Sequence, residues 1–320
     1  MPLFEMPLEQ MLVYEGINPR PEDHQEYWDR ALAEMQALGT EAELIPAAFQ
    51  APGVDCFDLF FTGVGGARVY AKLLLPKGKS SCPAVVRFHG YWGNSGDWMH
   101  HLAYAQAGFV VAALDCRGQG GLSEDVGGVK GTTLSGQIIR GLSDPDADKL
   151  TTRALFLDAA QLARIVMALP QVDAGRVGAT GGSQGGALTL ACASLEPGVA
   201  RLAPVYPFMC DYKRVWEMDL DVAAYAELRE YFRRFDPQHK REEEIFTKLG
   251  YIDLQHLAHR VKGETLMCVG LMDMVCPPST QFAAYNKITA SKRYELWPDF
   301  GHEALPGSED MIFSYMAEML

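Results

Sequence analysis

The spacing of apolar residues predicts an ordered series of strands and helices. Two strand-like runs, residues 56–61 and 68–75, flank the glycine-rich segment 63–66, which predicts an antiparallel hairpin. From residue 83 onward, short apolar runs alternate with helical patterns. The expected strands are 84–88, 109–114, 176–179, 202–205, 265–271 and 294–297, and the expected helices are 101–107, 151–169, 187–193 and 280–288.

This alternation predicts an α/β fold with a mostly parallel central sheet and helices on both faces, because parallel strands need crossover connections. The hairpin would supply an antiparallel N-terminal edge. We expect one domain over residues 1–320, with 1–55 as an N-terminal extension of helix and loop. The sheet pattern stops over residues 206–262, which we interpret as a helical insertion near the carboxyl ends of the strands. Its aromatic residues would pack on the sheet, or form a wall of a substrate pocket or a subunit contact.

Composition narrows the choice of partners. The chain has 48% hydrophobic residues and a formal net charge of -13. The negative charge disfavours binding to nucleic acid and to anionic membranes, and it favours a neutral or cationic substrate. No apolar run is long enough to span a bilayer, and residues 1–10 lack the pattern of a signal peptide. The seven cysteines include no CxxC pair, which is typical of reduced thiols. The expected location is therefore the cytoplasm.

Residues 181–185, Gly-Gly-Ser-Gln-Gly, match the G-x-S-x-G pattern directly after an expected strand and before an apolar helical run. In the α/β-hydrolase fold this pattern forms a sharp turn that exposes a nucleophilic serine, here Ser183. A phosphate-binding loop is the alternative, but no lysine follows and the G-x-G-x-x-G spacing is absent. The motif therefore predicts an α/β-hydrolase fold.

The partners of the nucleophile are expected in the order acid, then histidine. Asp273 and His302 each follow an expected strand downstream of Ser183. Asp299 is a rival acid, but it is only three residues from His302, which makes a hydrogen bond between them awkward. Three other downstream histidines, His239, His256 and His259, fall in the insertion among charged residues. We therefore predict a Ser183–His302–Asp273 triad.

Two backbone N–H groups are expected to form the oxyanion hole. One belongs to Gln184, directly after the nucleophile, and the other to Tyr91 in the His-Gly-Tyr loop at 89–91. His89 is interpreted as a residue that orders this loop. Adjacent His100 and His101 would not converge on one ion if they lie on a helix, so no metal site is expected. Arg117 is interpreted as a salt-bridged packing residue, with an anion clamp as the alternative.

Three blocks, Arg-Gly-Gln at 117–119, Gly-Gly-Ser-Gln-Gly at 181–185 and His-Glu at 302–303, together resemble the acetyl xylan esterase and cephalosporin-C deacetylase family. The resemblance implies a cofactor-independent serine esterase that removes acetyl groups from xylo-oligosaccharides, other small acetylated sugars and cephalosporin C. It assigns Ser183, Asp273 and His302 to the triad, and Tyr91 and Gln184 to the oxyanion hole. It also implies a ring-like homohexamer that admits small substrates to an internal cavity.

The chain differs from the family pattern at Trp92, where members often carry asparagine or a small residue, and this bears on the acyl pocket. We expect Tyr91, Trp92, Phe208 and Trp216 to contact substrate. An acyl-peptide or aminopeptidase-like hydrolase is a rival interpretation, although its usual propeller domain would not fit in 320 residues. A non-catalytic binding protein with a hydrolase fold is a second alternative, which an intact triad disfavours.

Overall fold

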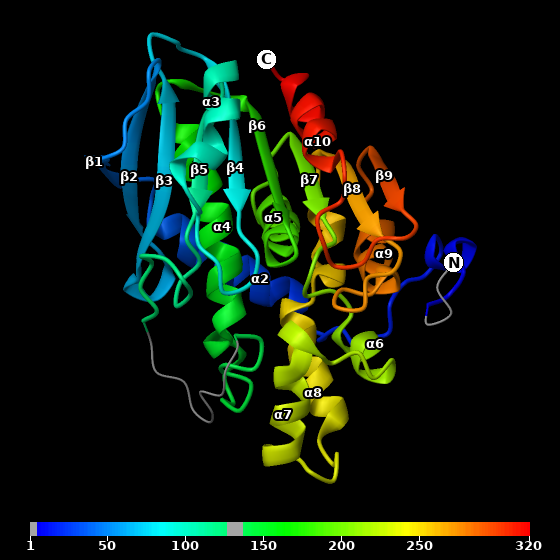
Figure 1. Ribbon diagram of the computed structural model, residues 1–320. Helices are drawn as coiled ribbons and strands as arrows, with labels where there is room; N and C mark the ends of the chain where they lie inside the picture. Colours follow the sequence, from blue (N-terminus) through cyan, green and yellow to red (C-terminus); the bar gives the residue numbers. More distant parts are fainter. Residues whose placement is uncertain (1–4, 127–136) are drawn as a thin grey trace.

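The computed structural model describes residues 5–126 and 137–320, which build one nine-stranded sheet with helices around it (Figure 1). The strands lie in the order β1-β2-β3-β5-β4-β6-β7-β8-β9. Their bounds are β1 Ala42–Pro46, β2 Val54–Thr62, β3 Arg68–Pro76, β4 Cys82–Phe88, β5 Val110–Leu114, β6 Val172–Gly182, β7 Arg201–Val205, β8 Glu264–Gly270 and β9 Lys292–Trp297. The helices are α1 Leu8–Met11, α2 His24–Ala37, α3 Leu102–Ala107, α4 Thr151–Ala168, α5 Gln184–Leu195, α6 Tyr212–Glu217, α7 Ala226–Phe235, α8 Glu242–Leu249, α9 Pro278–Lys287 and α10 Ser308–Ala317.

The pairing of the strands divides the sheet into two parts. Strands β1, β2, β3 and β5 pair antiparallel in that order, while β5, β4, β6, β7, β8 and β9 pair parallel. Strand β5, which lies between β3 and β4, has all five of its residues buried. The apolar run of β5 thus follows from its position inside the sheet with both faces covered. The predicted fold class is confirmed, including the antiparallel edge.

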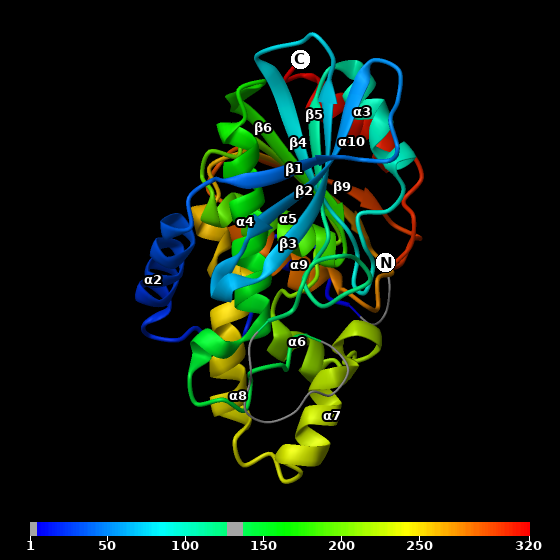
Figure 2. The same ribbon diagram turned by 90° about the vertical axis from the view of Figure 1, so that its left-hand side faces the viewer.

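Two apolar cores lie on opposite faces of the sheet, because successive side chains of a strand point to opposite sides. On β4, Val85 belongs to the core that includes residues of α3 and α10, whereas Val86 belongs to the core that includes α2, α4 and α5. Figure 2 shows α2 and α4 on one side of the sheet and α3 and α10 on the other. Helix α4 lies between the sheet and α2, where Trp28 stacks on Phe156 with ring centroids 6.1 Å apart.

The sequence pattern did not predict strand β1 or helix α10. Strand β1 is an edge strand whose side chains are mostly exposed, so it lacks the alternation of a half-buried strand. Helix α10 buries Ile312, Tyr315 and Met316, which lie at helical spacing in the sequence. Strand β6 is also longer than expected. Its first half, at 172–176, was not predicted because it is polar and is partly buried or exposed.

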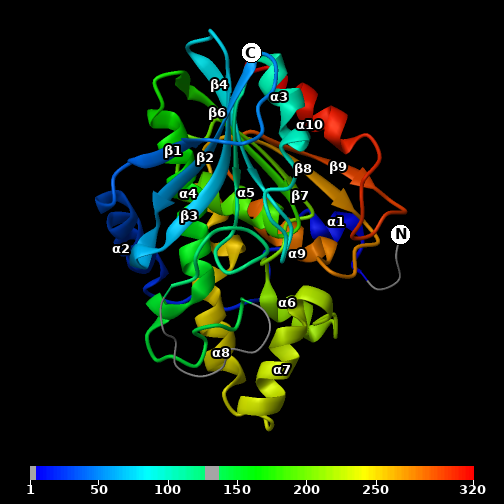
Figure 3. The ribbon, with the colours of Figure 1, turned by 60° about the vertical axis from the view of Figure 1, so that its left-hand side comes forward.

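Helices α6, α7 and α8 lie between β7 and β8 in sequence and form a lobe beyond the carboxyl ends of the parallel strands (Figures 1 and 3). Within the lobe, Trp216 packs against Phe232 at 4.6 Å between ring centroids, and Phe232 against Phe246 at 5.8 Å. Many of the lobe's aromatic residues therefore pack on one another. Across the described parts of the chain, the helices are too short or too polar to cross a bilayer.

Candidate active site

Ser183 lies on a sharp turn between β6 and α5. Its backbone has φ 59° and ψ −119°, a sparsely populated conformation that costs about 1–3 kcal/mol and persists only when the surroundings enforce it. The Ser183 N–H donates to the Val205 carbonyl at 3.0 Å, and the Ser183 carbonyl accepts from the N–H groups of Ala187 at 2.9 Å and Phe208 at 3.1 Å. The turn is thus fixed by the neighbouring strand and by its own helix.

The glycines of the turn are required by close backbone contacts. A Cβ on Gly181 would lie 2.4 Å from the Phe88 carbonyl oxygen, and one on Gly185 would lie 2.2 Å from the same atom. Because Phe88 ends the neighbouring strand β4, the absence of these side chains lets the segment after β4 approach the start of α5. The glycines of the motif are therefore a condition for the geometry of the site.

The structure brings the three predicted triad residues together. His302 Nε2 lies 2.9 Å from Ser183 Oγ, and His302 Nδ1 lies 2.8 Å from Asp273 Oδ2. The other oxygen, Asp273 Oδ1, accepts the backbone N–H groups of Val275 at 2.8 Å and Cys276 at 2.7 Å. Asp273 has no exposed surface, whereas the His302 side chain is partly exposed. The carboxylate is thus held by its own loop while it orients the imidazole, the arrangement used for nucleophilic catalysis.

The rival acid and histidines lie elsewhere. Asp299 is exposed on the surface between β9 and His302. His256 is buried in the short helical turn Leu254–His256 after α8, where its Nε2 lies 3.1 Å from the Asn18 carbonyl, and burial lowers its pKa to about 4. His239 packs against Trp216 and Phe232 within the lobe. The two histidines therefore have local contacts that do not involve Ser183.

The loop at 89–91 passes directly beside the turn at Ser183. A Cβ on Gly90 would lie 3.9 Å from the Gly182 carbonyl, and one on Gly185 would lie 3.2 Å from the His89 carbonyl. His89 Nδ1 lies 2.7 Å from the Gly90 carbonyl and its Nε2 accepts the Cys116 N–H at 3.0 Å. These contacts fix one neutral tautomer, and burial also lowers the pKa of His89. His89 therefore orders the loop, consistent with the interpretation of the sequence.

Gln119, from the Arg-Gly-Gln block, connects the two sides of the predicted oxyanion hole. Its Oε1 accepts the Trp92 N–H at 2.8 Å, and its Nε2 donates to Gln184 Oε1 at 2.8 Å. Gln184 Nε2 donates back to Gln119 Oε1 at 3.1 Å. The Gln119 side-chain amide thus links Trp92, which follows Tyr91, to Gln184, which follows Ser183. This role of Gln119 was not predicted, although its place in the block was the available signal.

Arg117, in the same block, is a buried ion-pair residue. Its Nε and one terminal nitrogen each donate to Asp158 of α4 at 2.6 Å, and its other terminal nitrogen donates to the Val64 carbonyl at 3.2 Å. The exposed fractions of the two side chains are only 3% and 2%. The packing interpretation of Arg117 therefore agrees with the structure, and its guanidinium faces Asp158 rather than an open anion site.

The predicted substrate-contacting side chains have different environments. Trp92 is 62% exposed, has φ 60° and stacks on Tyr91 with ring centroids 5.0 Å apart. Phe208 is fully buried and packs against the Tyr91 ring with ring centroids 5.9 Å apart. Trp216 packs inside the aromatic cluster of the lobe. Substrate contact by Tyr91, Trp92, Phe208 and Trp216 stays a prediction.

Two further residues beside the triad were not predicted. Tyr206, directly after β7, has φ 32° and packs its ring against that of His302 at 4.7 Å between centroids. Cys276 is buried next to Asp273, and burial holds the pKa of its thiol well above the usual range. Both residues follow strands or site motifs, but their contacts depend on tertiary packing that sequence spacing does not encode.

One group of side chains in residues 5–126 and 137–320 could hold a metal ion. It consists of Asp273, Cys276 and His302, whose ligand atoms lie within 4.8 Å of one another. However, both Asp273 oxygens and both His302 nitrogens already have the hydrogen-bond partners of the triad. The Cys276 thiol, which would have to lose its proton to bind, is held neutral by burial. The cluster is therefore explained by the hydrogen bonding of the triad.

The parallel sheet, the strained serine at the start of α5 and the adjacent histidine and aspartate define a protein of the α/β-hydrolase class. A sequence profile of the acetyl xylan esterase family matches residues 1–319. The chain therefore belongs to the acetyl xylan esterase family, a family of carboxylic-ester hydrolases, which confirms the resemblance seen in the sequence.

Individual relatives agree with this assignment. The crystal structure of acetyl xylan esterase 1 from Thermoanaerobacterium sp. JW/SL YS485 is similar with 56% identity and a TM-score of 0.97, over 98% of this chain and 99% of that one. An acetyl xylan esterase from Paenibacillus sp. R4 is similar with 33% identity and a TM-score of 0.93, over 98% and 100% of the two chains. Among curated proteins, acetyl esterase Axe7A of Xylanibacter ruminicola is 26% identical over 87% of this chain. This chain spans 62% of the length of that relative.

Proposed function

We propose that this chain removes acetyl groups from small acetylated carbohydrates such as xylo-oligosaccharides, and from cephalosporin C, with Ser183 as nucleophile. The observation that carries the proposal is the continuous hydrogen-bonded series from Ser183 Oγ through His302 to Asp273. The named activities of the relatives from Thermoanaerobacterium and Paenibacillus support an acetylated xylan-derived substrate. The net charge of -13 favours neutral esters of this kind over anionic ones.

Acylation begins when Ser183 Oγ attacks the acetyl carbonyl and His302 Nε2 takes the proton of the hydroxyl. Negative charge develops on the carbonyl oxygen in the transition state. The backbone N–H groups of Tyr91 and Gln184 stabilise this charge by donating hydrogen bonds to that oxygen. His302 then passes the proton to the departing sugar oxygen. The products of this half-reaction are a free sugar hydroxyl and an acetyl ester on Ser183.

Deacylation repeats the same steps with water as the attacking group. His302 Nε2 removes a proton from water, the hydroxide adds to the acetyl carbonyl, and the C–O bond to Ser183 breaks. The Ser183 oxygen recovers its proton from His302, and acetate leaves. Asp273 keeps the Nδ1–H tautomer of His302 and stabilises the imidazolium formed in each half-reaction.

The substrate class can be tested by measuring acetate release from acetylated xylobiose and from cephalosporin C, with a peptide anilide in parallel. We expect acetate from the first two substrates and no cleavage of the anilide. Cleavage of the anilide alone would contradict the deacetylase and favour an acyl-peptide hydrolase. Acetate from the sugar but not from cephalosporin C would restrict the proposal to carbohydrate esters.

The proposed assembly is a homohexamer, and the proposed location is the cytoplasm. The hexamer follows from the family resemblance, and light scattering tests it by a mass near six times 35.3 kDa. A mass near that of one chain would contradict it. The location is supported by the seven cysteines, all of which are buried free thiols. Fractionation of cells that express the natural gene tests the location.

A further inference from the structure

Glu227 is a buried carboxylate in the first turn of α7, in the helical lobe. Its exposed fraction is only 5%, and within residues 5–126 and 137–320 it forms no ion pair. A buried carboxylate without a cationic partner is costly unless hydrogen bonds compensate for the lost hydration. Its place near a helix N-terminus favours the negative charge. We therefore expect hydrogen-bond donors to surround the Glu227 carboxylate.

Hydrogen-bond donors converge on this carboxylate from the Tyr91 side chain and from the backbone at 137–139. Glu227 Oε1 accepts the Tyr91 hydroxyl at 3.0 Å and the Gln137 N–H at 3.2 Å, and Oε2 accepts the Ile139 N–H at 3.1 Å. The Gln137 N–H also donates to the Tyr91 hydroxyl oxygen at 2.6 Å. Burial raises the pKa of Glu227 to about 7, while these donors act in the opposite direction. All of these partners donate, so the ionised form matches them best.

The link to Tyr91 gives Glu227 a connection to the reaction. Tyr91 carries one of the two N–H groups proposed for the oxyanion hole, and its hydroxyl is the group that Glu227 holds. The Tyr91 ring, which lies between its backbone N–H and its hydroxyl, packs against the rings of Trp92 and Phe208. Anchoring the hydroxyl therefore limits the rotation of the Tyr91 side chain and the drift of its backbone N–H.

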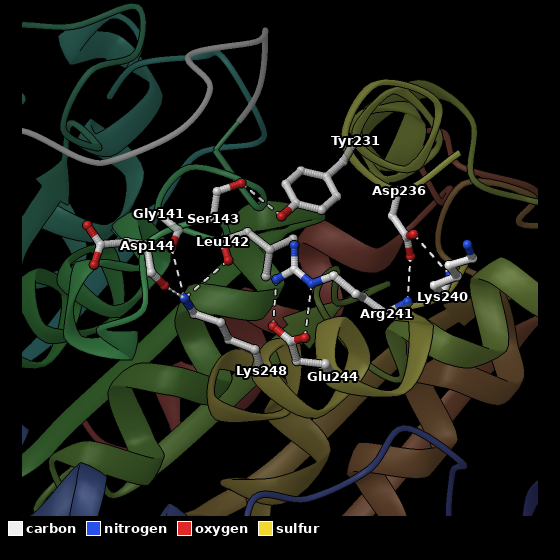
Figure 4. Close-up of polar contacts among 10 residues, drawn as sticks. All are labelled: Gly141, Leu142, Ser143, Asp144, Tyr231, Asp236, Lys240, Arg241, Glu244 and Lys248. Atoms are coloured by element: carbon white, nitrogen blue, oxygen red, sulfur yellow. Dashed lines mark hydrogen bonds and ion pairs between the residues drawn. The ribbon is translucent and has the colours of Figure 1, made fainter. Parts of the chain in front are cut away.

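Side chains of the lobe hydrogen-bond to both the N–H groups and the carbonyl groups of the backbone at 137–144. Glu227 of α7 accepts N–H groups at 137 and 139, whereas Lys248 of α8 donates to the carbonyls of Gly141 and Leu142 at 3.1 Å and also to that of Asp144 (Figure 4). Figure 4 also shows the Tyr231 hydroxyl against the Ser143 hydroxyl, at 2.8 Å. The segment that supports Glu227 and Tyr91 is thus fixed to two helices of the lobe.

We propose that Glu227 is a positioning residue for the oxyanion hole, acting on the Tyr91 N–H through the Tyr91 hydroxyl. The inference rests on the proposed esterase function and gives the helical lobe a part in it. An amide at position 227 cannot replace the carboxylate, because its NH₂ group would face at least one donor, either the Ile139 N–H or the pair formed by Tyr91 and Gln137. Glu227→Gln is therefore nearly isosteric but mismatched.

The test compares Glu227→Gln with Glu230→Gln, an exposed carboxylate on the same helix that pairs with Arg234. The substrate is p-nitrophenyl acetate, and the second readout is the inhibition constant of methylboronic acid, which adds to Ser183 as a tetrahedral analogue. For Glu227→Gln we expect kcat to fall about 10-fold to 100-fold with KM nearly unchanged, since the oxyanion contact is made in the transition state. Boronate inhibition should weaken by a similar factor, and Glu230→Gln should match the wild type.

Tyr91→Phe provides the second arm, because it removes the hydroxyl but keeps Glu227 and the backbone N–H. It should lower kcat in the same direction, and the double variant should lose no more than Glu227→Gln alone, because the two changes interrupt one connection. The inhibition constant does not depend on the fraction of folded enzyme, so it separates positioning from loss of fold. Unchanged boronate inhibition in both single variants, or additive losses in the double variant, would overturn the proposal. A wild-type enzyme without esterase activity would instead refute the proposed function.

Discussion

Replacing Asp273 with asparagine tests the proposed role of Asp273 in orienting the His302 imidazole. Asp273 Oδ1 accepts two backbone N–H groups, from Val275 and Cys276, and Oδ2 lies against His302 Nδ1. An asparagine has one oxygen and one NH₂ group. The two backbone donors require the oxygen at the Oδ1 position, so the NH₂ group must face His302.

The magnitude follows from that forced orientation. Facing an NH₂ group, His302 Nδ1 must accept a hydrogen bond, and the ring proton moves to Nε2, 2.9 Å from Ser183 Oγ. In this tautomer Nε2 cannot take the proton of the serine hydroxyl. The same substitution in a serine protease triad lowers kcat by about 10⁴-fold, which corresponds to about 5 kcal/mol of transition-state stabilisation. We expect a loss of that order here.

The assay is the kcat for acetate release near neutral pH, with circular dichroism to verify that the variant is folded. The matched control is Asp299→Asn, which changes an exposed carboxylate close to His302 in sequence. Asp299→Asn should keep activity within about twofold of the wild type, because an exposed side chain outside the network contributes little. A folded Asp273→Asn enzyme with near-normal kcat, or an inactive Asp299→Asn enzyme, would refute the assignment.

Three further outcomes are expected. Asp158→Asn leaves the buried guanidinium of Arg117 without its charged partner and should lower the free energy of unfolding by about 3–5 kcal/mol in urea titrations, whereas an unchanged midpoint would contradict a buried pair. Gly185→Ala places a Cβ 2.2 Å from the Phe88 carbonyl, so soluble enzyme with wild-type kcat would contradict the packing at the turn. His101 has its pKa lowered from 6.5 to about 4, mainly by burial and then by Arg87, so the unfolded chain binds a proton more readily. The contribution of the neutral His101 side chain to the free energy of unfolding is complete above pH 6.5 and is lost as the pH falls toward 4, by about 3 kcal/mol. A His101→Gln variant that loses as much unfolding free energy between pH 7 and pH 4.5 as the wild type would contradict it.

The arrangement of Ser183, His302 and Asp273 was largely predictable, because short local motifs mark these residues. Ser183 is marked by its glycines, and Asp273 and His302 each follow a strand in the order typical of the fold. The parallel core was predictable for a similar reason, since strands such as β5 are continuous apolar runs. Strand β1 was missed because its exposed side chains carry no alternating pattern.

The support of the site was not predictable, because its contacts join residues far apart in sequence. Gln119 forms a hydrogen bond with Gln184, 65 positions later in the sequence, and Tyr91 forms one with Glu227, 136 positions later. No periodicity connects such pairs, and a charged residue such as Glu227 resembles its solvated neighbours on the same helix. Only the packing of the lobe against the loop at 89–91 shows that this carboxylate is buried and surrounded by donors.

The most direct test of Ser183 as the nucleophile of an acetyl esterase is acetate release from acetylated xylobiose by the wild-type enzyme and by Ser183→Ala at matched concentrations. Removing a triad nucleophile leaves only the contribution of the oxyanion hole and of substrate binding, so we predict a fall in kcat of at least about 10³-fold with the fold retained. A folded Ser183→Ala enzyme that releases acetate at a rate close to that of the wild type would contradict the account.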